Sequence, residues 1–312
     1  MRCSMGYRGG MSRLAANLLL LLTAFMWGSA FVAQSTAMSS VGPLVFTGLR
    51  FLIAAACLAP FAWREARRHR GAPVSRAHMG MFVGVGVVFF LGIALQQSAL
   101  VVTTVTNAGF LTGLYVVMVP FFGAALFRDM PHPAVWPASL ASLAGVYLLG
   151  GGHMDGLNWG DGMLIICAVF WALHVVLVGR VGMSSGRPLA LAFAQFSVVG
   201  VLALLPGLVF EGVSLAGIKD IWLELFYTSI LSGGFAFTLQ IIAQRWTKAA
   251  DAAIILSAEA LFAALCGALI LGERLDAMGL VGCGLIFASI VMVQLAPLIT
   301  RRDRYASPPP GL

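Results

Sequence analysis

Charged side chains are scarce in this chain. Asp, Glu, Lys and Arg make up only 10% of its 312 residues, whereas 60% of the residues are hydrophobic. A soluble domain carries about 25% charged residues, which keep its surface in water. The scarcity therefore excludes a soluble globular protein and predicts an integral membrane protein.

Motifs of enzymes and of nucleic-acid-binding proteins are also absent. The sequence has no HExxH, GxSxG or Walker-type loop, so we expect no enzyme. Its five cysteines are an odd number and lie mostly in apolar stretches, which predicts neither a disulfide framework nor a metal site. The sequence lacks a basic patch interleaved with aromatic residues, so we expect no binding to nucleic acid. We expect no cofactor, and the one ion that we expect the chain to bind is the proton.

Hydrophobic residues form ten stretches of roughly 17–25 residues, each long enough to cross the ~30 Å hydrocarbon core of a bilayer as a helix. The loops between them are too short for a soluble domain, and a backbone in lipid must satisfy its own hydrogen bonds. We therefore predict ten transmembrane helices, at about residues 14–34, 43–63, 77–99, 105–127, 134–150, 160–180, 188–210, 221–243, 252–271 and 277–297.

Both ends of the chain are polar. Residues 1–13 are basic, and Met11 is an alternative start to Met1 because MSRLAAN leads directly into the first apolar stretch. A basic leader before an apolar run also resembles a signal peptide, but no convincing small-residue cleavage site precedes Pro43. We expect a cytoplasmic N-terminal segment at 1–13 and a cytoplasmic tail at 298–312.

Basic residues fall almost entirely on one side of this predicted membrane. If the N-terminus is cytoplasmic, Lys219 and Arg274 are the only two of the 19 lysines and arginines outside, and Arg50 lies within the membrane. Cytoplasmic loops carry an excess of Lys and Arg. The pattern predicts a multi-pass protein of the cell (plasma or inner) membrane with both termini in the cytoplasm, and it accounts for the net charge of +7.

A shift of 144 residues along the chain brings polar residues and tryptophans into register, which indicates an internal repeat. The matched pairs include Trp27 with Trp171, Leu95 with Leu239, Gln96 with Gln240, Thr103 with Thr247, and Asn107 with Asp251. The repeats would span residues 14–150 and 160–297. Each holds five spans, an odd number, so the second repeat enters the membrane from the opposite side. Inverted repeats allow alternating access to a site near the midplane, which favours a transporter.

Four segments resemble EamA-type members of the drug/metabolite transporter superfamily. They are AFMWGSAFVA at the first span, GLRFLIAAA at the second, NAGFLTGLYVVMVPFFGAALF at the fourth, and SAEALFAALCGALILGERL at the ninth and tenth. The resemblance implies an all-α integral membrane protein with ten transmembrane helices, arranged as two inverted five-helix repeats around a central cavity. It also implies that the fifth and tenth spans are peripheral. Small pairs such as Ala141 with Gly145 and Gly284 with Ala288 would pack there.

Glu259 is the only carboxylate near the middle of a predicted span. A charge at that depth costs on the order of 2.5–3.5 kcal/mol on insertion scales, so it needs a compensating role. The functional interpretation is a protonatable or cation-binding group facing the cavity. The alternative is a carboxyl that holds its helix to a neighbour. The repeat places Tyr115 at the equivalent point of the span 105–127.

Aromatic and polar residues of other spans are further candidates for substrate binding. His174 lies one helical turn after Trp171 and shares its face; it either titrates or binds substrate, or it is a neutral core histidine. Trp27 and Trp171 either stack on a flat substrate or fill space between helices. Gln96, Gln240 and Asn107 either line the cavity or bridge helices.

Arg50 lies about seven residues into its span, within reach of the outer interface by snorkelling, so we expect it to be structural. The pair formed by Arg50 and Phe51 is frequent in the family that the chain resembles, and the resemblance implies that Arg50 pairs with helix C-terminal carbonyls or an acidic side chain. Holding an anionic substrate is the alternative.

The function predicted from these features is secondary active transport, more specifically export, of small amphipathic metabolites such as amino acids, amines or drugs. The partners would be this substrate and the lipid bilayer, with the protein a monomer or homodimer. A helical membrane scaffold or channel-like protein is the alternative, and neither would concentrate a solute.

Overall fold

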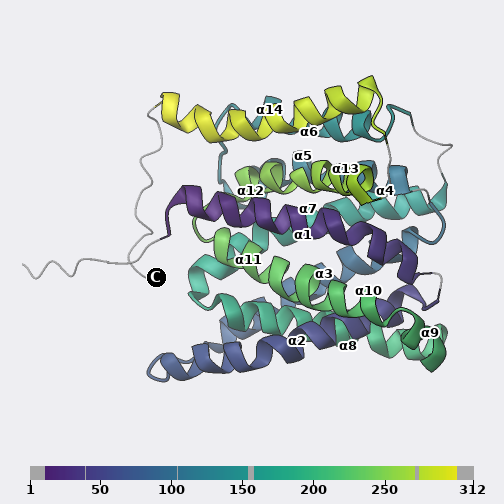
Figure 1. Ribbon diagram of the computed structural model, residues 1–312. Helices are drawn as coiled ribbons and strands as arrows, with labels where there is room; N and C mark the ends of the chain where they lie inside the picture. Colours follow the sequence, from purple (N-terminus) through teal and green to yellow (C-terminus); the bar gives the residue numbers. More distant parts are fainter. Residues whose placement is uncertain (1–10, 39, 104, 154–157, 271–273, 301–312) are drawn as a thin grey trace, which may run out of the picture.

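The computed structural model describes residues 11–38, 40–103, 105–153, 158–270 and 274–300, and every regular element in these ranges is a helix (Figure 1). Most of the basic N-terminal segment and of the polar tail lies outside the described residues. The elements are α1 (Arg13–Ala37), α2 (Pro43–Arg68), α3 (Arg76–Ala99), α4 (Val105–Gly113), α5 (Tyr115–Phe127), α6 (Val135–Leu149), α7 (Trp159–Ser185), α8 (Pro188–Phe210), α9 (Leu215–Asp220), α10 (Trp222–Tyr227), the π-helix η1 (Thr228–Ala236), α11 (Phe237–Ala243), α12 (Ala249–Leu256), α13 (Ala258–Ile270) and α14 (Ala277–Thr300).

The predicted fold class is confirmed. Among the described residues, nine helical stretches are long and apolar enough to cross a membrane, and the shorter apolar helix α6 supplies the tenth crossing. At 1.5 Å per residue its 15 residues reach only about 22 Å, so α6 is shorter than a typical span.

Two of the crossings are interrupted near their middle, which the apolar pattern did not predict. The span 105–127 consists of α4 and α5, with Leu114 between them, and Pro120 in α5 cannot donate a backbone hydrogen bond. The span 252–271 consists of α12 and α13, with Ser257 between them. The Ser257 hydroxyl donates to the carbonyl of Ile254 at 2.6 Å, a local bond that bends helices.

A third irregularity is the π-helix η1 in the middle of the crossing formed by α10, η1 and α11. Its sequence, TSILSGGFA, contains two adjacent glycines and three small hydroxyl residues. Serine and threonine side chains satisfy the backbone here, since Ser229 Oγ donates to the carbonyl of Leu225 at 2.5 Å. π-helices are rare and occur frequently at functional sites.

Helices α2 and α8 form a pair at one edge of the bundle (Figure 1). Each helix carries a glutamate at or near its C-terminal end, and this glutamate caps the start of the other helix. Glu65 accepts from the backbone of Leu189 and Ala190 at 3.2 and 2.9 Å, and Glu211 accepts from that of Leu44 and Val45 at 2.9 Å each. Carboxylates stabilise helix N-termini, where backbone N–H groups lack partners. The reciprocal caps fix this antiparallel pair.

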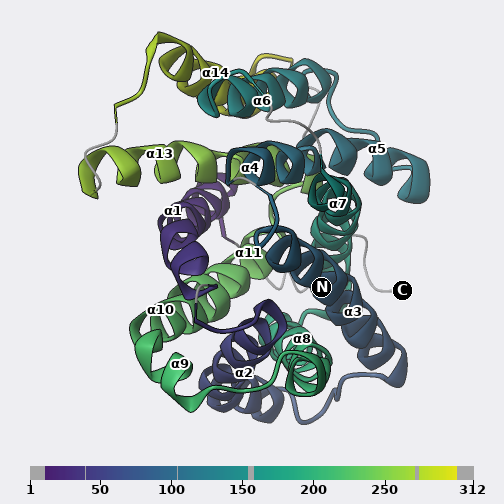
Figure 2. The ribbon, with the colours of Figure 1, turned by 90° about the vertical axis from the view of Figure 1, so that its right-hand side faces the viewer.

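Helices α6 and α14 pack against one another at the opposite edge, the peripheral position that the resemblance implied (Figures 1 and 2). A Cβ on Gly145 would lie 2.7 Å from the carbonyl oxygen of Gly282, and one on Gly282 would lie 2.6 Å from that of Gly145. Small residues thus let the two backbones touch. The prediction was right for Gly145 but wrong for Gly284, whose Cβ position faces open space.

Between these edges, the first helix of each repeat packs mainly with helices of the other repeat. Helix α1 contacts η1, α11, α12 and α13, whereas α7 contacts α3, α4 and α5. Figure 2, which looks along the bundle, shows α1 and α7 on opposite sides of its centre. We call α1 with η1, α11, α12 and α13 the α1 group, and α7 with α3, α4 and α5 the α7 group. The centre of the protein is therefore enclosed by both repeats.

Candidate functional site

A cavity of about 50 Å³ lies between the α1 and α7 groups. Its wall includes residues of α1, α2, α3, α5, α7, η1, α11 and α13, so both repeats contribute to it. Six of the eight candidates predicted from the sequence line it: Glu259, Tyr115, Trp27, Trp171, Gln96 and Gln240. The sequence did not single out Gln34, Ser232 or Phe237, which also line it.

Aromatic rings form one side of the cavity. The rings of Trp27 and Trp171 both pack against Phe237, at centroid distances of 4.6 and 5.9 Å. Trp27 Nε1 donates to the carbonyl of Ser232 in η1 at 3.2 Å, whereas Trp171 Nε1 is buried without a partner among the described residues. Trp27 is therefore anchored to the π-helix, and Trp171 retains a donor.

Glu259 and Tyr115 stand at equivalent positions just after the two helix interruptions. Tyr115 is the first residue of α5, and Glu259 is the second residue of α13. The N-terminus of a helix favours a negative charge, so α13 helps to support the Glu259 carboxylate at this depth. Glu259 is half-buried, and neither it nor the Tyr115 hydroxyl has a hydrogen bond among the described residues. Both polar groups are available to a ligand.

Several other buried polar atoms on the cavity wall lack a partner in the described part of the chain. They are Thr112 Oγ1, Gln97 Oε1, Trp171 Nε1, and both Oε1 and Nε2 of Gln240, whose side chain is 0% exposed. A buried polar group without a hydrogen bond costs about 1–3 kcal/mol. Few such atoms occur in a native protein, and their convergence on one small cavity indicates that waters or a ligand satisfy them.

Arg50 also lines the cavity, and its predicted snorkelling to the outer interface is wrong. The side chain is only 2% exposed. Its guanidinium donates to the carbonyl of Thr228 at 3.1 Å, to Gln34 Oε1 at 2.8 Å and to Ser232 Oγ at 2.9 Å. Thr228 follows the last residue of α10 and is the first residue of η1, so the accepting carbonyl lies at a junction between two helical segments and not at a free helix end. These acceptors hold the guanidinium inward against η1, to which Thr228 and Ser232 belong.

His174 shares a helix with Trp171 but does not line the cavity. It is fully buried, its Nε2 lies 3.0 Å from Gln195 Oε1 of α8, and its ring stacks on Phe89 at 4.6 Å. The Trp171 and His174 rings meet edge to face at 5.7 Å, so the predicted shared face exists. However, α3 and α8 cover the His174 part of that face. The arrangement is that of a core histidine.

Asn107 is also remote from the cavity. Its amide Nδ2 approaches the two carboxylate oxygens of Asp161, near the start of α7, at 3.3 and 3.4 Å. Thr103 Oγ1 donates to the same carboxylate at 2.5 Å, and the backbone N–H of Asn158 donates to it at 2.8 Å. Asp161 is 1% exposed. This cluster fastens α7 to the connection between α3 and α4.

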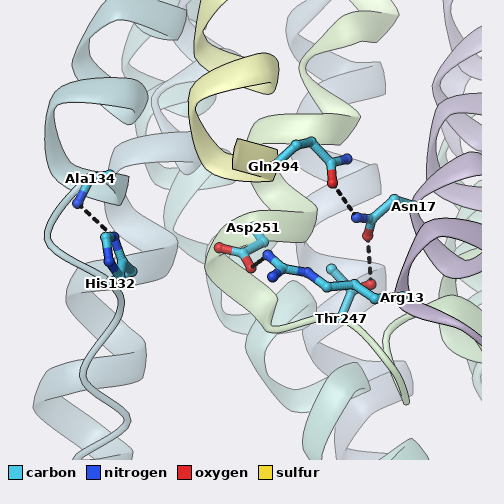
Figure 3. Close-up of polar contacts among 7 residues, drawn as sticks. All are labelled: Arg13, Asn17, His132, Ala134, Thr247, Asp251 and Gln294. Carbon is cyan, nitrogen blue, oxygen red and sulfur yellow. Dashed lines mark hydrogen bonds and ion pairs between the residues drawn. The ribbon is translucent and has the colours of Figure 1, made fainter. Parts of the chain in front are cut away.

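An equivalent cluster fastens α1 to the connection between α11 and α12. Asn17 Oδ1 accepts from Thr247 Oγ1 at 2.7 Å, and Asn17 Nδ2 donates to Gln294 Oε1 at 2.6 Å (Figure 3). Beside it, Arg13 pairs with Asp251 at 2.8 Å. The repeat shift of 144 residues relates Asn17 to Asp161 just as it relates Thr103 to Thr247. The two clusters are therefore counterparts in the inverted repeats.

A second cavity, of about 710 Å³, lies at the end of the bundle where α1 begins. It is lined by α5, the second half of α7, and the connection between α11 and α12. Basic side chains outnumber acidic ones on its wall, where Arg180, Arg245 and Lys248 face Asp129. We call this cavity the vestibule. No group of His, Cys, Asp and Glu suited to a metal ion occurs among the described residues.

Comparison with known proteins places these features in a family. The model of the EamA-like transporter family matches the chain twice, at residues 14–151 and 158–295. An "Uncharacterized transporter" of Archaeoglobus fulgidus is 32% identical over 92% of this chain and 88% of its own length. The "Uncharacterized inner membrane transporter YedA" of Escherichia coli K12 is 24% identical, over 86% of this chain and 87% of its own.

A protein of known crystal structure has a similar fold. It superposes with a TM-score of 0.78 and covers 93% of this chain and 99% of its own, at 21% sequence identity. At that identity the likeness supports the arrangement of helices alone.

Proposed function

Because this chain belongs to the EamA-like transporter family and is a membrane transporter, we propose that it is a secondary active exporter of small amphipathic metabolites such as amino acids, amines or drugs, working by alternating access. The observation that carries the proposal is the central cavity, on which a carboxylate and several unpartnered buried polar atoms converge. Such atoms gain most from a ligand that replaces the water they lose on burial.

The cavity is too small for a metabolite. A volume of about 50 Å³ holds one or two waters, since each takes roughly 30 Å³ in the liquid. A metabolite therefore requires the α1 and α7 groups to separate. The interruptions at Leu114 and Ser257 and the π-helix η1 all border the cavity and are natural positions for bending.

Export is supported by the vestibule and by the charge pattern. Nearly all lysines and arginines lie in segments that the predicted topology places inside, which favours a cytoplasmic N-terminus in the inner membrane of the cell. The vestibule opens beside the start of α1 and would then face the cytoplasm. It would be the first part of the protein that a solute of the cytoplasm meets.

Glu259 is the proposed coupling residue. It lies within a predicted membrane span, it lines the cavity, and it makes no hydrogen bond to the described residues. A carboxyl group in that setting can exchange a proton when the cavity opens to each side, so that a proton gradient drives the solute.

The test is Glu259→Gln in proteoliposomes with an imposed pH gradient. The amide fills the same space, so the variant should fold, yet proton-driven accumulation should be abolished while exchange between equal substrate pools survives. The matched control is Glu65→Gln, which changes a carboxylate that caps α8 and lies outside the cavity. Equal, pH-responsive accumulation by wild type and Glu259→Gln, per folded molecule, would rule out the coupling role.

The same assay separates transport from the alternative of a scaffold or channel-like protein. A transporter accumulates substrate above its external concentration and saturates. A channel equilibrates the solute without concentrating it, and a scaffold moves none.

A further inference from the structure

Three basic side chains on the wall of the vestibule have no acidic partner. Arg180, Arg245 and Lys248 line this cavity, whose volume is about 710 Å³. The single ion pair of the described residues instead joins Arg13 to Asp251 (Figure 3). All three side chains are half-buried, unlike the exposed arginines at the end of α2. The excess of basic residues on a cytoplasmic face accounts for exposed charges, but withdrawing an unpaired charge from water costs free energy. These cations therefore need an anion that the described part of the chain does not supply.

The two arginines come from different helix groups and are positioned by uncharged contacts. Arg180 belongs to α7, and its Cζ lies 4.2 Å from the ring centroid of Phe127, the last residue of α5. Its Nη2 donates to the carbonyl of Phe127 at 3.3 Å, one bond of the five that a guanidinium can donate. Arg245 follows α11, and its Nε is buried without a partner among the described residues. Both guanidinium groups thus keep the donors that bind an oxyanion in pairs.

The start of α12 adds backbone donors to the same wall. Lys248 is the N-cap residue of α12, and no side chain caps the helix there. The first N–H groups of a helix have no partner within it, and the helix dipole favours an anion beside them. Ala249 and Ala250, which carry such N–H groups, line the vestibule. Asp129 is on the same wall, but it is exposed, so water and salt screen its charge. The wall as a whole favours an anion.

A buried amide indicates that the ligand also donates a hydrogen bond. Gln244 is 2% exposed and lines the vestibule. Its Nε2 donates to the carbonyl of Val175 at 2.9 Å, which fixes the orientation of the amide, whereas its Oε1 is buried without a partner in the described part of the chain. A buried acceptor without a donor is costly. A phosphate that carries a hydroxyl, as hydrogen phosphate and a phosphoglycerol headgroup do, satisfies this acceptor, and a carboxylate does not.

We propose that the vestibule is a binding site for a phosphate group, held by the three basic side chains and the start of α12, with Gln244 accepting from a hydroxyl of the ligand. Two sources share this chemistry: the headgroup of an anionic glycerophospholipid and free phosphate of the cytoplasm. The vestibule lies at the end of the bundle where α1 begins, which the predicted topology places on the cytoplasmic side, where both occur. Its lining residues differ from those of the central cavity, so the site does not depend on which solute is transported.

Isothermal titration calorimetry of the purified full-length protein in a nonionic detergent tests the site directly. The probes are dihexanoylphosphatidylglycerol, dihexanoylphosphatidylcholine and inorganic phosphate, each at the same ionic strength set with chloride. We expect phosphatidylglycerol, inorganic phosphate or both to bind at least about tenfold more tightly than phosphatidylcholine, whose headgroup is neutral overall and carries no hydroxyl. Tight binding of phosphatidylglycerol alone assigns the source to lipid, and tight binding of inorganic phosphate shows that free phosphate suffices. If neither binds more tightly than phosphatidylcholine, the proposal is overturned.

A matched pair of triple variants separates a site from general surface charge. In the vestibule variant, glutamine replaces the three basic side chains. In the control variant, Arg64→Gln, Arg68→Gln and Arg70→Gln remove the same charge from exposed positions on the same predicted face. The vestibule variant should weaken binding at least about tenfold, whereas the control should change it little. Equal losses in both would show that binding follows net charge, and the site would be refuted.

A single substitution keeps the test decisive if the vestibule variant does not fold. The Lys248 side chain makes no hydrogen bond to the described residues, so Lys248→Gln should fold. It should weaken binding about two- to fivefold relative to Arg68→Gln, its single control. Unchanged affinity in Lys248→Gln would contradict the role of this residue.

Failure of this inference differs from failure of the proposed function. If the protein concentrates a solute but binds neither phosphate probe more tightly than phosphatidylcholine, the transport function holds and the vestibule site is refuted. If it binds phosphate but concentrates no member of a broad metabolite panel, the site holds and the transport proposal fails.

Discussion

The two equivalent polar clusters make a quantitative prediction about stability. Asp161→Ala removes a carboxylate that accepts hydrogen bonds from Thr103 and from the backbone of Asn158, at a position 1% exposed. Asn17→Ala removes the counterpart in α1, which makes one bond to Thr247 and one to Gln294. Both variants disconnect the start of a helix from a connection in the other repeat.

The expected magnitudes differ because one cluster is charged and the other is neutral. Hydrogen bonds to a charged group contribute about 1.5–3 kcal/mol each, so the two short bonds of Asp161 are worth about 3 kcal/mol at the low end. Two neutral bonds of Asn17 are worth about 1 kcal/mol each, or about 2 kcal/mol. At roughly 2 °C per kcal/mol for a chain of this size, Asp161→Ala should lower Tm by about 6 °C and Asn17→Ala by about 4 °C.

The assay is thermal unfolding of purified protein in detergent, followed with a thiol-reactive dye. The other four cysteines are replaced by serine in every variant, because Cys57 is exposed, so that the signal comes from Cys167, which is buried in α7 and reacts only when the helices separate. Ser197→Ala is the control, because its hydroxyl bonds only to the carbonyl of Phe193 one turn earlier in α8. If Asp161→Ala lowered Tm no more than Ser197→Ala, the cluster would contribute nothing to holding α7, and the reasoning would be refuted.

Two further predictions concern topology and packing. In a variant lacking the native cysteines, a single cysteine at exposed His69 should resist a membrane-impermeant thiol reagent in intact cells while one at exposed Lys219 reacts, and the reverse pattern would contradict a cytoplasmic N-terminus. Gly28→Ala should cost about 1–3 kcal/mol and impair transport, because its Cβ would lie 2.4 Å from the backbone oxygen of Glu259 and displace α13. Gly84→Ala, with open space around its Cβ position, should be neutral or slightly stabilising in the same unfolding assay; equal Tm changes for both would show that the approach of α1 to α13 is not tight.

Most of the candidate site could be predicted because rare polar residues in apolar helices are conspicuous. Glu259, Tyr115, Gln96, Gln240 and the tryptophans stand out in the sequence for that reason, and all of them line the cavity. His174 was equally conspicuous, yet it lies beside the cavity against Gln195. Periodicity gives the face of a helix, but it does not say which neighbour covers that face.

Arg50 illustrates what sequence distance cannot provide. Its position seven residues into a span suggested an exit to the interface, but its partners Thr228 and Ser232 are nearly 180 residues away in the chain. Both partners belong to η1, a π-helix, whose irregularity depends on packing and has no strong local signal. The repeat likewise matched Thr103 with Thr247. It did not indicate that Thr103 binds Asp161 and that Thr247 binds Asn17.

The sequence by itself predicted ten membrane crossings, a duplication of the chain, and an inversion of the two halves. These properties follow from local composition, from the length of apolar runs, and from the odd number of spans in each repeat. Only the tertiary structure decided the grouping of α1 with the second repeat and α7 with the first, the helix interruptions, and the meeting of Arg50 with Glu259 in one cavity. Those features depend on how helices distant in sequence pack against one another, because lipid-facing and cavity-facing positions of a uniformly apolar helix look the same until its neighbours are in place.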